Sequence, residues 1–224
     1  MASAPELLIV DSSARETRSI TRSLTKLFAD NWKQSGDEVI CRRDVGLRPP
    51  HFISETWIAA AFTPPTERSD EMRRQLALSD QLIAEIKAAD VIVLGAPMYN
   101  YSMPASLKAW FDLIARIGET FSFDLSRGDY PIAPLLSGKK LVVLSSRGEF
   151  GFEKEGIRFH INALDPAIAA CAHYLGAAQE DIHLISADYE EFKDERWERS
   201  VAAAREKTHN LATTLREQLE PVIA

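Results

Sequence analysis

A turn rich in aromatic and amide side chains, residues 97–102, is the stretch of this sequence best suited to hold a ligand. Met98, Tyr99 and Tyr101 can lie against a flat aromatic ring system. Asn100 and the backbone N–H groups can bond to the heteroatoms of such a ring. The alternative is a proline-bracketed turn whose tyrosines pack on the core. It accounts for either tyrosine alone but less well for the whole cluster, so the turn predicts a ligand site.

A second polar stretch, Ser12 to Thr21, brings several hydroxyl groups to the start of a predicted helix. Hydroxyls and free backbone N–H groups at a helix N-terminus suit a phosphate monoester. Arg15 and Arg18 can neutralise a phosphate or can simply be solvated, and Ser19 can be an ordinary N-cap. The stretch lacks both a glycine-rich phosphate loop and a GxGxxG pattern, which disfavours a classical NAD or ATP site there.

A third loop, Ser146 to Glu149, contains Gly148, where the backbone can approach a ligand closely. A strand-to-helix turn also favours glycine for its own geometry, so this loop alone is weak evidence. The two cysteines and five histidines show no metal-ligand spacing, and no GxSxG nucleophile pattern occurs. We therefore expect no metal site, and we expect the chemistry to be supplied by a bound cofactor.

These loops need a scaffold that brings them together, and the apolar pattern predicts one. Short apolar runs that alternate with helical patterns are typical of a doubly wound α/β fold with a five-stranded parallel sheet. In the flavodoxin-like strand order 2-1-3-4-5, with helices on both faces, strands 1, 3 and 4 are neighbours and their three loops share one crevice. We expect a single domain over residues 1–224. The predicted strands are 7–10, 39–41, 91–94, 141–144 and 181–185, and the predicted helices are about 19–34, 67–89, 105–116, 166–175 and 192–219.

Two further stretches lack the regular spacing of apolar residues that predicts a helix or a strand. The stretch from Arg48-Pro49-Pro50 to Thr66 is expected to be irregular, because Pro64-Pro65 breaks any helix there. Residues 118–138 are interpreted as an excursion, a hairpin over the site, in which Phe121 and Phe123 either roof the pocket or join the core. Ser35-Gly36-Asp37 is expected to end the first helix.

Composition limits the partners and the cellular compartment that we expect for this protein. The chain has 224 residues, 46% of them apolar, and a net charge of −7, which argues against nucleic acid or an anionic membrane as the main partner. We see neither a signal-peptide pattern nor an apolar run that could span a bilayer. Two cysteines without motif spacing favour a reducing cytoplasm.

The motif Ala96-Pro97-Met98-Tyr99-Asn100-Tyr101 resembles that of the FMN-dependent NADH:quinone oxidoreductases of the azoreductase type. Gly138-Lys139-Lys140 leading to Ser145-Ser146-Arg147-Gly148 looks like a second motif of that family. The resemblance extends from Leu7 to about Leu219. The first motif is accompanied by Pro104, Leu107-Lys108, Phe111-Asp112 and Arg116.

The resemblance implies an FMN site on a flavodoxin-like fold, in a homodimer with active sites at the subunit interface. Members of the family often have a second glycine where Glu149 stands, so this carboxylate either points away from the flavin or shifts its potential. Phe121 and Phe123 are the predicted substrate-pocket residues. The implied FMN-binding residues are Ser13, Ser19, Ile20, Thr21, Pro97, Met98, Tyr99, Asn100, Tyr101, Ser146, Arg147, Gly148 and Glu149.

The implied activity is a two-electron, ping-pong hydride transfer. NADH or NADPH reduces the flavin and leaves. A quinone or azo compound then binds where the nicotinamide was and accepts the two electrons. Two alternatives remain open at this point: a flavodoxin-like carrier that passes single electrons to a protein partner, and a binding module that keeps the fold without flavin.

Overall fold

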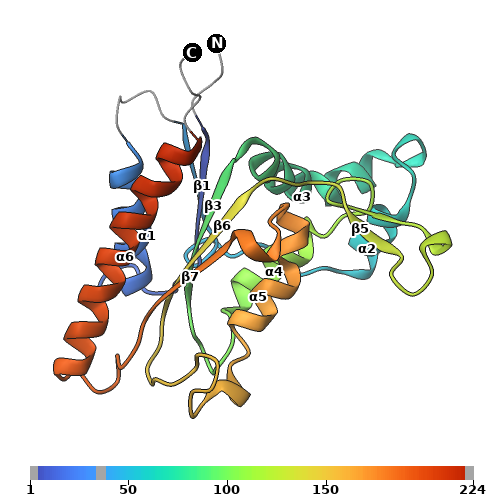
Figure 1. Ribbon diagram of the computed structural model, residues 1–224. Coiled ribbons are helices and arrows are strands. Elements are labelled where there is room, and N and C mark those ends of the chain that lie inside the picture. Colours follow the sequence, from blue (N-terminus) through green and yellow to red (C-terminus); the bar gives the residue numbers. More distant parts are fainter. Residues whose placement is uncertain (1–4, 34–38, 220–224) are drawn as a thin grey trace.

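The computed structural model describes residues 5–33 and 39–219. At its centre is a five-stranded parallel sheet with the order β2-β1-β3-β6-β7 (Figure 1). Counted along the sheet-forming strands this order is 2-1-3-4-5, so the predicted flavodoxin-like topology is confirmed. The strands are β1 Leu7–Asp11, β2 Ile40–Asp44, β3 Val91–Pro97, β6 Lys140–Ser146 and β7 Ile182–Ala187.

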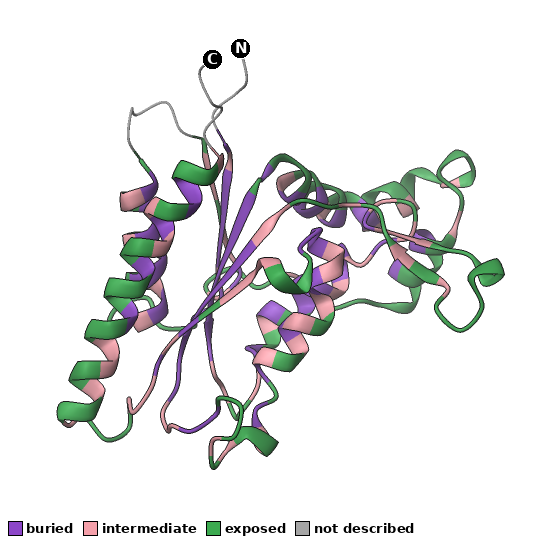
Figure 2. Cartoon of the chain, in the orientation of Figure 1, coloured by how far each residue is buried: buried purple, intermediate pink, exposed green. Residues whose placement is uncertain are grey.

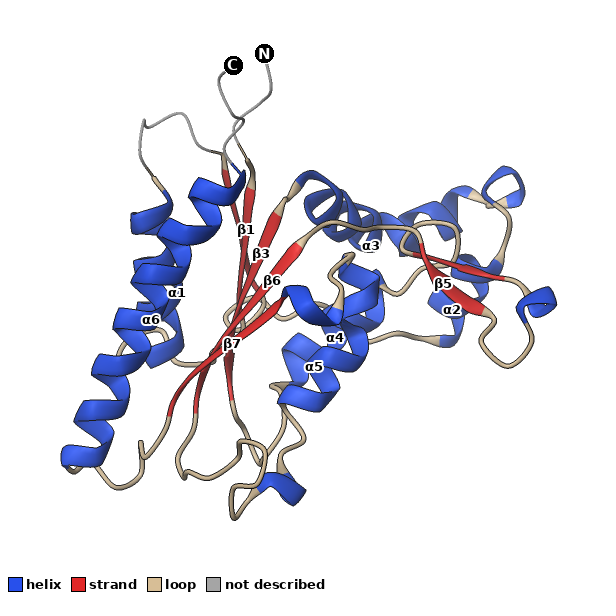
Figure 3. Cartoon of the chain, viewed as in Figure 1, coloured by secondary structure: helices blue, strands red, loops and turns tan. Residues whose placement is uncertain are grey.

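Helices cover both faces of this sheet (Figure 3). The helices α1 Ile20–Trp32 and α6 Glu195–Leu219 pack together on one face. The helices α3 Asp70–Ala88, α4 Ala105–Ile114 and α5 Asp165–Cys171 cover the other. All five correspond to predicted helices, with α5 prolonged by a 3₁₀ turn to Leu175.

The strands explain how one sheet can hold two cores. Successive side chains of a strand point to opposite faces. Leu7 and Ile9 join the core under α1 and α6, whereas Leu8 and Val10 join the core under α3, α4 and α5. Burial on both faces accounts for the uninterrupted apolar runs in the sequence. Figure 2 shows the central strands as almost wholly buried.

One helix was not predicted. The helix α2 Glu55–Phe62 lies in the stretch expected to be irregular. Ser54 caps it by accepting a hydrogen bond from the backbone N–H of Trp57 at 3.2 Å, and Trp57 is buried against α3. The prolines at 64 and 65 follow the end of α2 instead of preventing it, and the 3₁₀ turn Pro65–Glu67 leads on to α3.

The excursion over residues 118–138 does form a hairpin. Strands β4 Phe121–Phe123 and β5 Ile132–Pro134 pair in antiparallel fashion, joined by the 3₁₀ turn Leu125–Arg127. The hairpin is not placed over the carboxyl ends of the chain's own sheet, however. Figure 1 shows it projecting sideways beyond α3 and α5, well away from the loops at the bottom of the sheet.

The predicted stop of the first helix at residues 35–37 lies outside the described residues. Within residues 5–33 and 39–219 no helix is both long and apolar enough to cross a membrane. Two further 3₁₀ turns, Phe159–Ile161 and Gln179–Asp181, lie in the connections before α5 and β7.

Candidate functional site

A cavity of about 650 Å³ opens at the carboxyl ends of the parallel strands. It is large enough for a cofactor, since small-molecule sites usually have 300–1,000 Å³. Ser19, Asn100 and Gly148, from three different loops, all line it, as the predicted crevice requires. The lining residues are Ser13, Arg15, Arg18, Ser19, Ile20, Pro97, Met98, Tyr99, Asn100, Ser146, Gly148, Glu190, Glu191 and Lys193.

One end of the cavity is formed by the loop after β1. Ser13 is buried, and its hydroxyl oxygen accepts the backbone N–H of Arg15 at 3.2 Å. Arg22 holds the loop in place by donating to the carbonyls of Ser13 at 2.7 Å and Arg15 at 2.9 Å. The same guanidinium pairs with Asp44 at the end of β2. The loop therefore presents a fixed set of hydroxyl and amide groups.

The N-terminus of α1 continues this end of the cavity. Ser19 is the N-cap, accepting the backbone N–H of Arg22 at 3.3 Å, and it also lines the cavity. The cap and ligand interpretations of Ser19 are thus compatible. Thr21 is buried behind it, with its hydroxyl 3.2 Å from that of Ser19. The first N–H groups of a helix have no intrahelical acceptor, and with the helix dipole they favour an anion.

The other end is formed by the aromatic turn after β3. Tyr99 and Ser102 exchange two backbone hydrogen bonds, at 2.9 and 3.0 Å, around two residues with positive φ, Asn100 and Tyr101. The N–H of Met98 bonds to the carbonyl of Ser146 at 2.9 Å, which joins this turn to the end of β6. Met98, Tyr99 and Asn100 of this turn line the cavity, whereas Tyr101 lies outside its lining and is 44% exposed.

The loop after β6 contributes only alternate residues to the cavity. Ser146 and Gly148 line it, whereas Arg147 and Glu149 do not. Glu149 forms an ion pair with Arg158 at 2.7 Å, and its hydrogen bond raises the pKa of Tyr101. The carboxylate of Glu149 is therefore paired outside the cavity lining, as the first of the two interpretations from the sequence expects.

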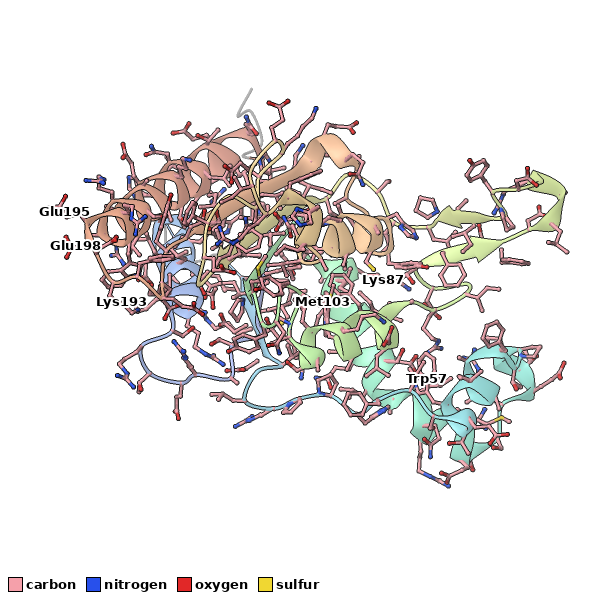
Figure 4. All side chains as sticks on the ribbon, turned by 90° about the horizontal axis from the view of Figure 1, so that it is seen from below. Trp57, Lys87, Met103, Lys193, Glu195 and Glu198 are labelled. Carbon is pink, nitrogen blue, oxygen red and sulfur yellow. The ribbon has the colours of Figure 1, made fainter. Side chains whose placement is uncertain are left out.

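The loop after β7 supplies the residues that sequence reasoning missed, Glu190, Glu191 and Lys193. Figure 4, seen from below the sheet, shows Lys193 just before the start of α6. Glu190 pairs across the cavity with Arg15 at 2.8 Å. Because β7 lies beside β6, its carboxyl end reaches the same edge of the sheet, and the predicted strand order could have included this fourth loop.

Backbone strain is concentrated around this cavity. Non-glycine residues with positive φ are uncommon and cost about 1 kcal/mol or more each, so they persist where the surrounding structure holds them. Those in the loops around the cavity are Arg18, Asn100, Tyr101, Tyr189 and Lys193.

Phe121 and Phe123, the predicted substrate-pocket residues, lie on the hairpin and do not line the cavity of their own chain. The ring of Phe121 packs against that of Tyr174 with centroids 5.5 Å apart. Phe123 is 48% exposed.

Comparison with known proteins matches residues 5–210 to the flavodoxin-like fold. The FMN-dependent NADH:quinone oxidoreductase 2 of Colwellia psychrerythraea is 50% identical over 218 residues, covering 93% of this chain and 98% of that protein. The FMN-dependent NAD(P)H:quinone oxidoreductase 1 of Pseudomonas aeruginosa is 36% identical, covering 92% and 97%. An FMN-dependent NADH-azoreductase from Bacillus anthracis, solved with FMN, shares the fold with a TM-score of 0.81 at 20% identity, covering 95% and 99%.

Proposed function

This chain belongs to the flavodoxin-like fold family and, within it, to the FMN-dependent NADH:quinone oxidoreductases, and from that premise we propose that it is an enzyme that reduces quinones with electrons from NADH or NADPH. Azo compounds are the second class of acceptor that the resemblance implies. The observation that supports the proposal is one cavity with hydroxyl groups and a helix N-terminus at one end and an aromatic turn at the other.

The residues at the two ends fit FMN. The hydroxyls of Ser13 and Ser19 and the N-terminus of α1 would hold the phosphate. Met98, Tyr99 and Asn100 would lie along the flavin ring. Gly148 has no side chain to obstruct the approach of the ring to the backbone at the end of β6.

When bound, FMN supplies the capacity to accept and donate a hydride. The protein's part is to bind the FMN, orient it and shield it from water. Arg22 fixes the phosphate loop, and the hydrogen bonds between Tyr99 and Ser102 fix the aromatic turn. Such rigid support keeps the binding groups in place before the cofactor arrives, which reduces the entropy lost on binding.

A spectrum and a steady-state assay test this proposal. We expect purified protein mixed with FMN to show bound-flavin absorption and to oxidise NADH with menadione as acceptor, with parallel lines in a double-reciprocal plot. Intersecting lines would contradict the ping-pong scheme. If an anaerobic titration with dithionite shows that the one-electron-reduced form of the flavin is stable, the result favours an electron carrier. Protein that stays colourless after mixing with FMN favours a binding module without flavin.

Substitution of Ser19 by alanine tests the phosphate end. We expect FMN affinity to fall about tenfold to a hundredfold, because a hydrogen bond to a charged group contributes about 1.5–3 kcal/mol. Riboflavin, which lacks the phosphate, should bind with nearly unchanged affinity. Ser69→Ala is the matched control, since Ser69 caps α3 by the same contact to the N–H of Met72 at 3.2 Å. Each variant should lose about 1 kcal/mol of stability, because each loses a helix cap. Equal FMN affinity in the two variants would contradict the assignment of Ser19 to the phosphate.

Substitution of Glu149 by glutamine tests the orientation of that carboxylate. Because it is paired with Arg158 outside the cavity, we expect the midpoint potential of the bound flavin to move by less than about 15 mV. Glu191→Gln, which removes a charge from the cavity lining, should move it further. A larger shift in the Glu149 variant, measured by dye-coupled reduction, would mean that its carboxylate faces the flavin.

We further propose that the protein is a homodimer in the cytoplasm. The resemblance supports the dimer, and so do large apolar side chains exposed on the hairpin and near α2. In this dimer the hairpin carrying Phe121 and Phe123 would roof the partner's cavity. Sedimentation analysis should give about twice the chain mass of 25.0 kDa. The exposed residues are Phe52, Phe62, Phe123, Leu125 and Tyr130.

A further inference from the structure

Arg147 lies between two residues that line the cavity, yet its side chain is buried on the far side of the loop. Only 5% of that side chain is exposed. Its Nη2 contacts both carboxylate oxygens of Asp165, at 2.8 and 2.7 Å. The guanidinium also lies over the ring of Phe152, 5.6 Å from its centroid. Arg147 therefore ties the loop after β6 to the start of α5.

A second carboxylate faces the same guanidinium. Asp188, just after β7, has its Oδ1 3.8 Å from the Nε of Arg147. Both atoms are buried, and neither has a hydrogen-bond partner within the described part of the chain. Burial raises the pKa of Asp188, while the charge of Arg147 acts in the opposite direction. One buried cation thus faces two half-buried carboxylates, one at the start of α5 and one just after β7.

The backbone around Arg147 joins the loop after β6 to the loop after β7. Its N–H bonds to the carbonyl of Ala187 at 2.9 Å, and its own carbonyl accepts the N–H of Glu190 at 3.1 Å. The next carbonyl, of Gly148, accepts the N–H of Glu191 at 3.0 Å. A methyl group on Gly148 would come within 2.7 Å of the carboxylate of Glu191, so the two loops are tightly packed where they line the cavity.

We propose that Arg147 is a positioning residue for the flavin, which it does not contact. By holding Asp165 and Asp188, its guanidinium fixes the relative position of the β6 and β7 loops, and so of Gly148 and Glu191 in the cavity wall. Removing the arginine leaves the carboxylates of Asp165 on α5 and Asp188 on the β7 loop without their shared counterion. Their repulsion then moves the β7 loop away from α5, and the β6 loop loses its side-chain tie to both. The inference deepens the proposed function and rests on it.

The test compares Arg147→Met and Arg147→Lys with Arg116→Met. Arg116 is the control because its side chain is also fully buried and paired, with Asp80 at 3.1 Å and Ser79 at 2.9 Å, but it lies beyond the far end of α4. Each variant is measured for urea stability, FMN affinity by fluorescence, and midpoint potential at saturating FMN. Wild-type protein that fails to bind FMN would refute the proposed function itself, before any variant is compared.

We expect Arg147→Met to lose at least tenfold in FMN affinity and to shift the two-electron equilibrium of the bound flavin by about tenfold, which is about 30 mV. Arg116→Met should retain both values whatever its stability. Arg147→Lys keeps the charge, but its single nitrogen cannot face Asp165 and Asp188 together as Nη2 and Nε of the arginine do. It should therefore fold and show smaller changes in the same direction. Wild-type affinity and potential in the lysine variant, or in a folded methionine variant, would overturn the inference.

Discussion

Replacing Gly46 with alanine is expected to weaken FMN binding by at least a hundredfold and to lower the free energy of unfolding by about 2–3 kcal/mol. Gly46 follows β2 and packs directly on the loop that forms the phosphate end of the cavity. An added Cβ would lie 2.1 Å from the carbonyl oxygen of Ser13 and 2.8 Å from the carbonyl carbon of Ser12. These are backbone atoms, which cannot rotate away as the end of a side chain can.

The displaced loop is the one that Arg22 holds. The carbonyl of Ser13 accepts a hydrogen bond from Arg22 at 2.7 Å, so moving it by an ångström breaks this contact and shifts the adjacent hydroxyl. A misplacement of this size at a binding group is enough to lose most of its contribution. Fluorescence titration with FMN and urea unfolding without it measure the two effects.

Gly138→Ala provides the matched control for Gly46→Ala. Gly138 lies just before β6, at the end of the sheet opposite the cavity, with φ of +75°, and an added Cβ would meet no atom within 4 Å. Alanine there should cost about 1 kcal/mol, from backbone strain alone, and leave FMN affinity unchanged. Gly46→Ala protein with wild-type affinity would show that the loop carrying Ser13 does not bind the phosphate.

The position of the cavity could be predicted from the sequence because it depends on strand order and little else. Uninterrupted apolar runs indicate strands buried on both faces, and parallel strands of this order bring their carboxyl ends to one edge. Ser19, Asn100 and Gly148 follow three such strands, and the structure places all three in one cavity. The periodicity of the chain was sufficient for this part.

Side-chain direction could not be predicted in the same way, because it depends on partners distant in the sequence. Arg147 and Glu149 alternate with cavity residues but are turned outward by Asp165 and Arg158. Gly46 shows no motif, and its importance follows only from its packing against Ser13. The short helix α2 was missed for a related reason, since burial of Trp57 against α3 stabilises it more than its own eight residues do.

Replacing Trp110 with alanine is expected to give the largest loss of stability, about 3–5 kcal/mol. Trp110 lies on α4, is 0% exposed, and packs edge-on against Phe111 with ring centroids 5.0 Å apart. Alanine leaves a large void, because a packed core relaxes only partly around it. For a chain of 224 residues the melting temperature should fall by roughly 10 °C, measured without FMN so that ligand binding does not mask the change.

Replacing Trp110 with phenylalanine separates the contribution of ring packing to stability from that of the unpaired indole N–H group. The indole Nε1 of Trp110 is buried and has no hydrogen-bond partner among the described residues. Phenylalanine keeps most of the ring and removes that unpaired N–H group, so Trp110→Phe should lose less than half as much stability as Trp110→Ala. Equal losses in the two variants would contradict this account. Because α4 begins directly after the aromatic turn, the alanine variant should also bind FMN more weakly, whereas the phenylalanine variant should bind it almost normally.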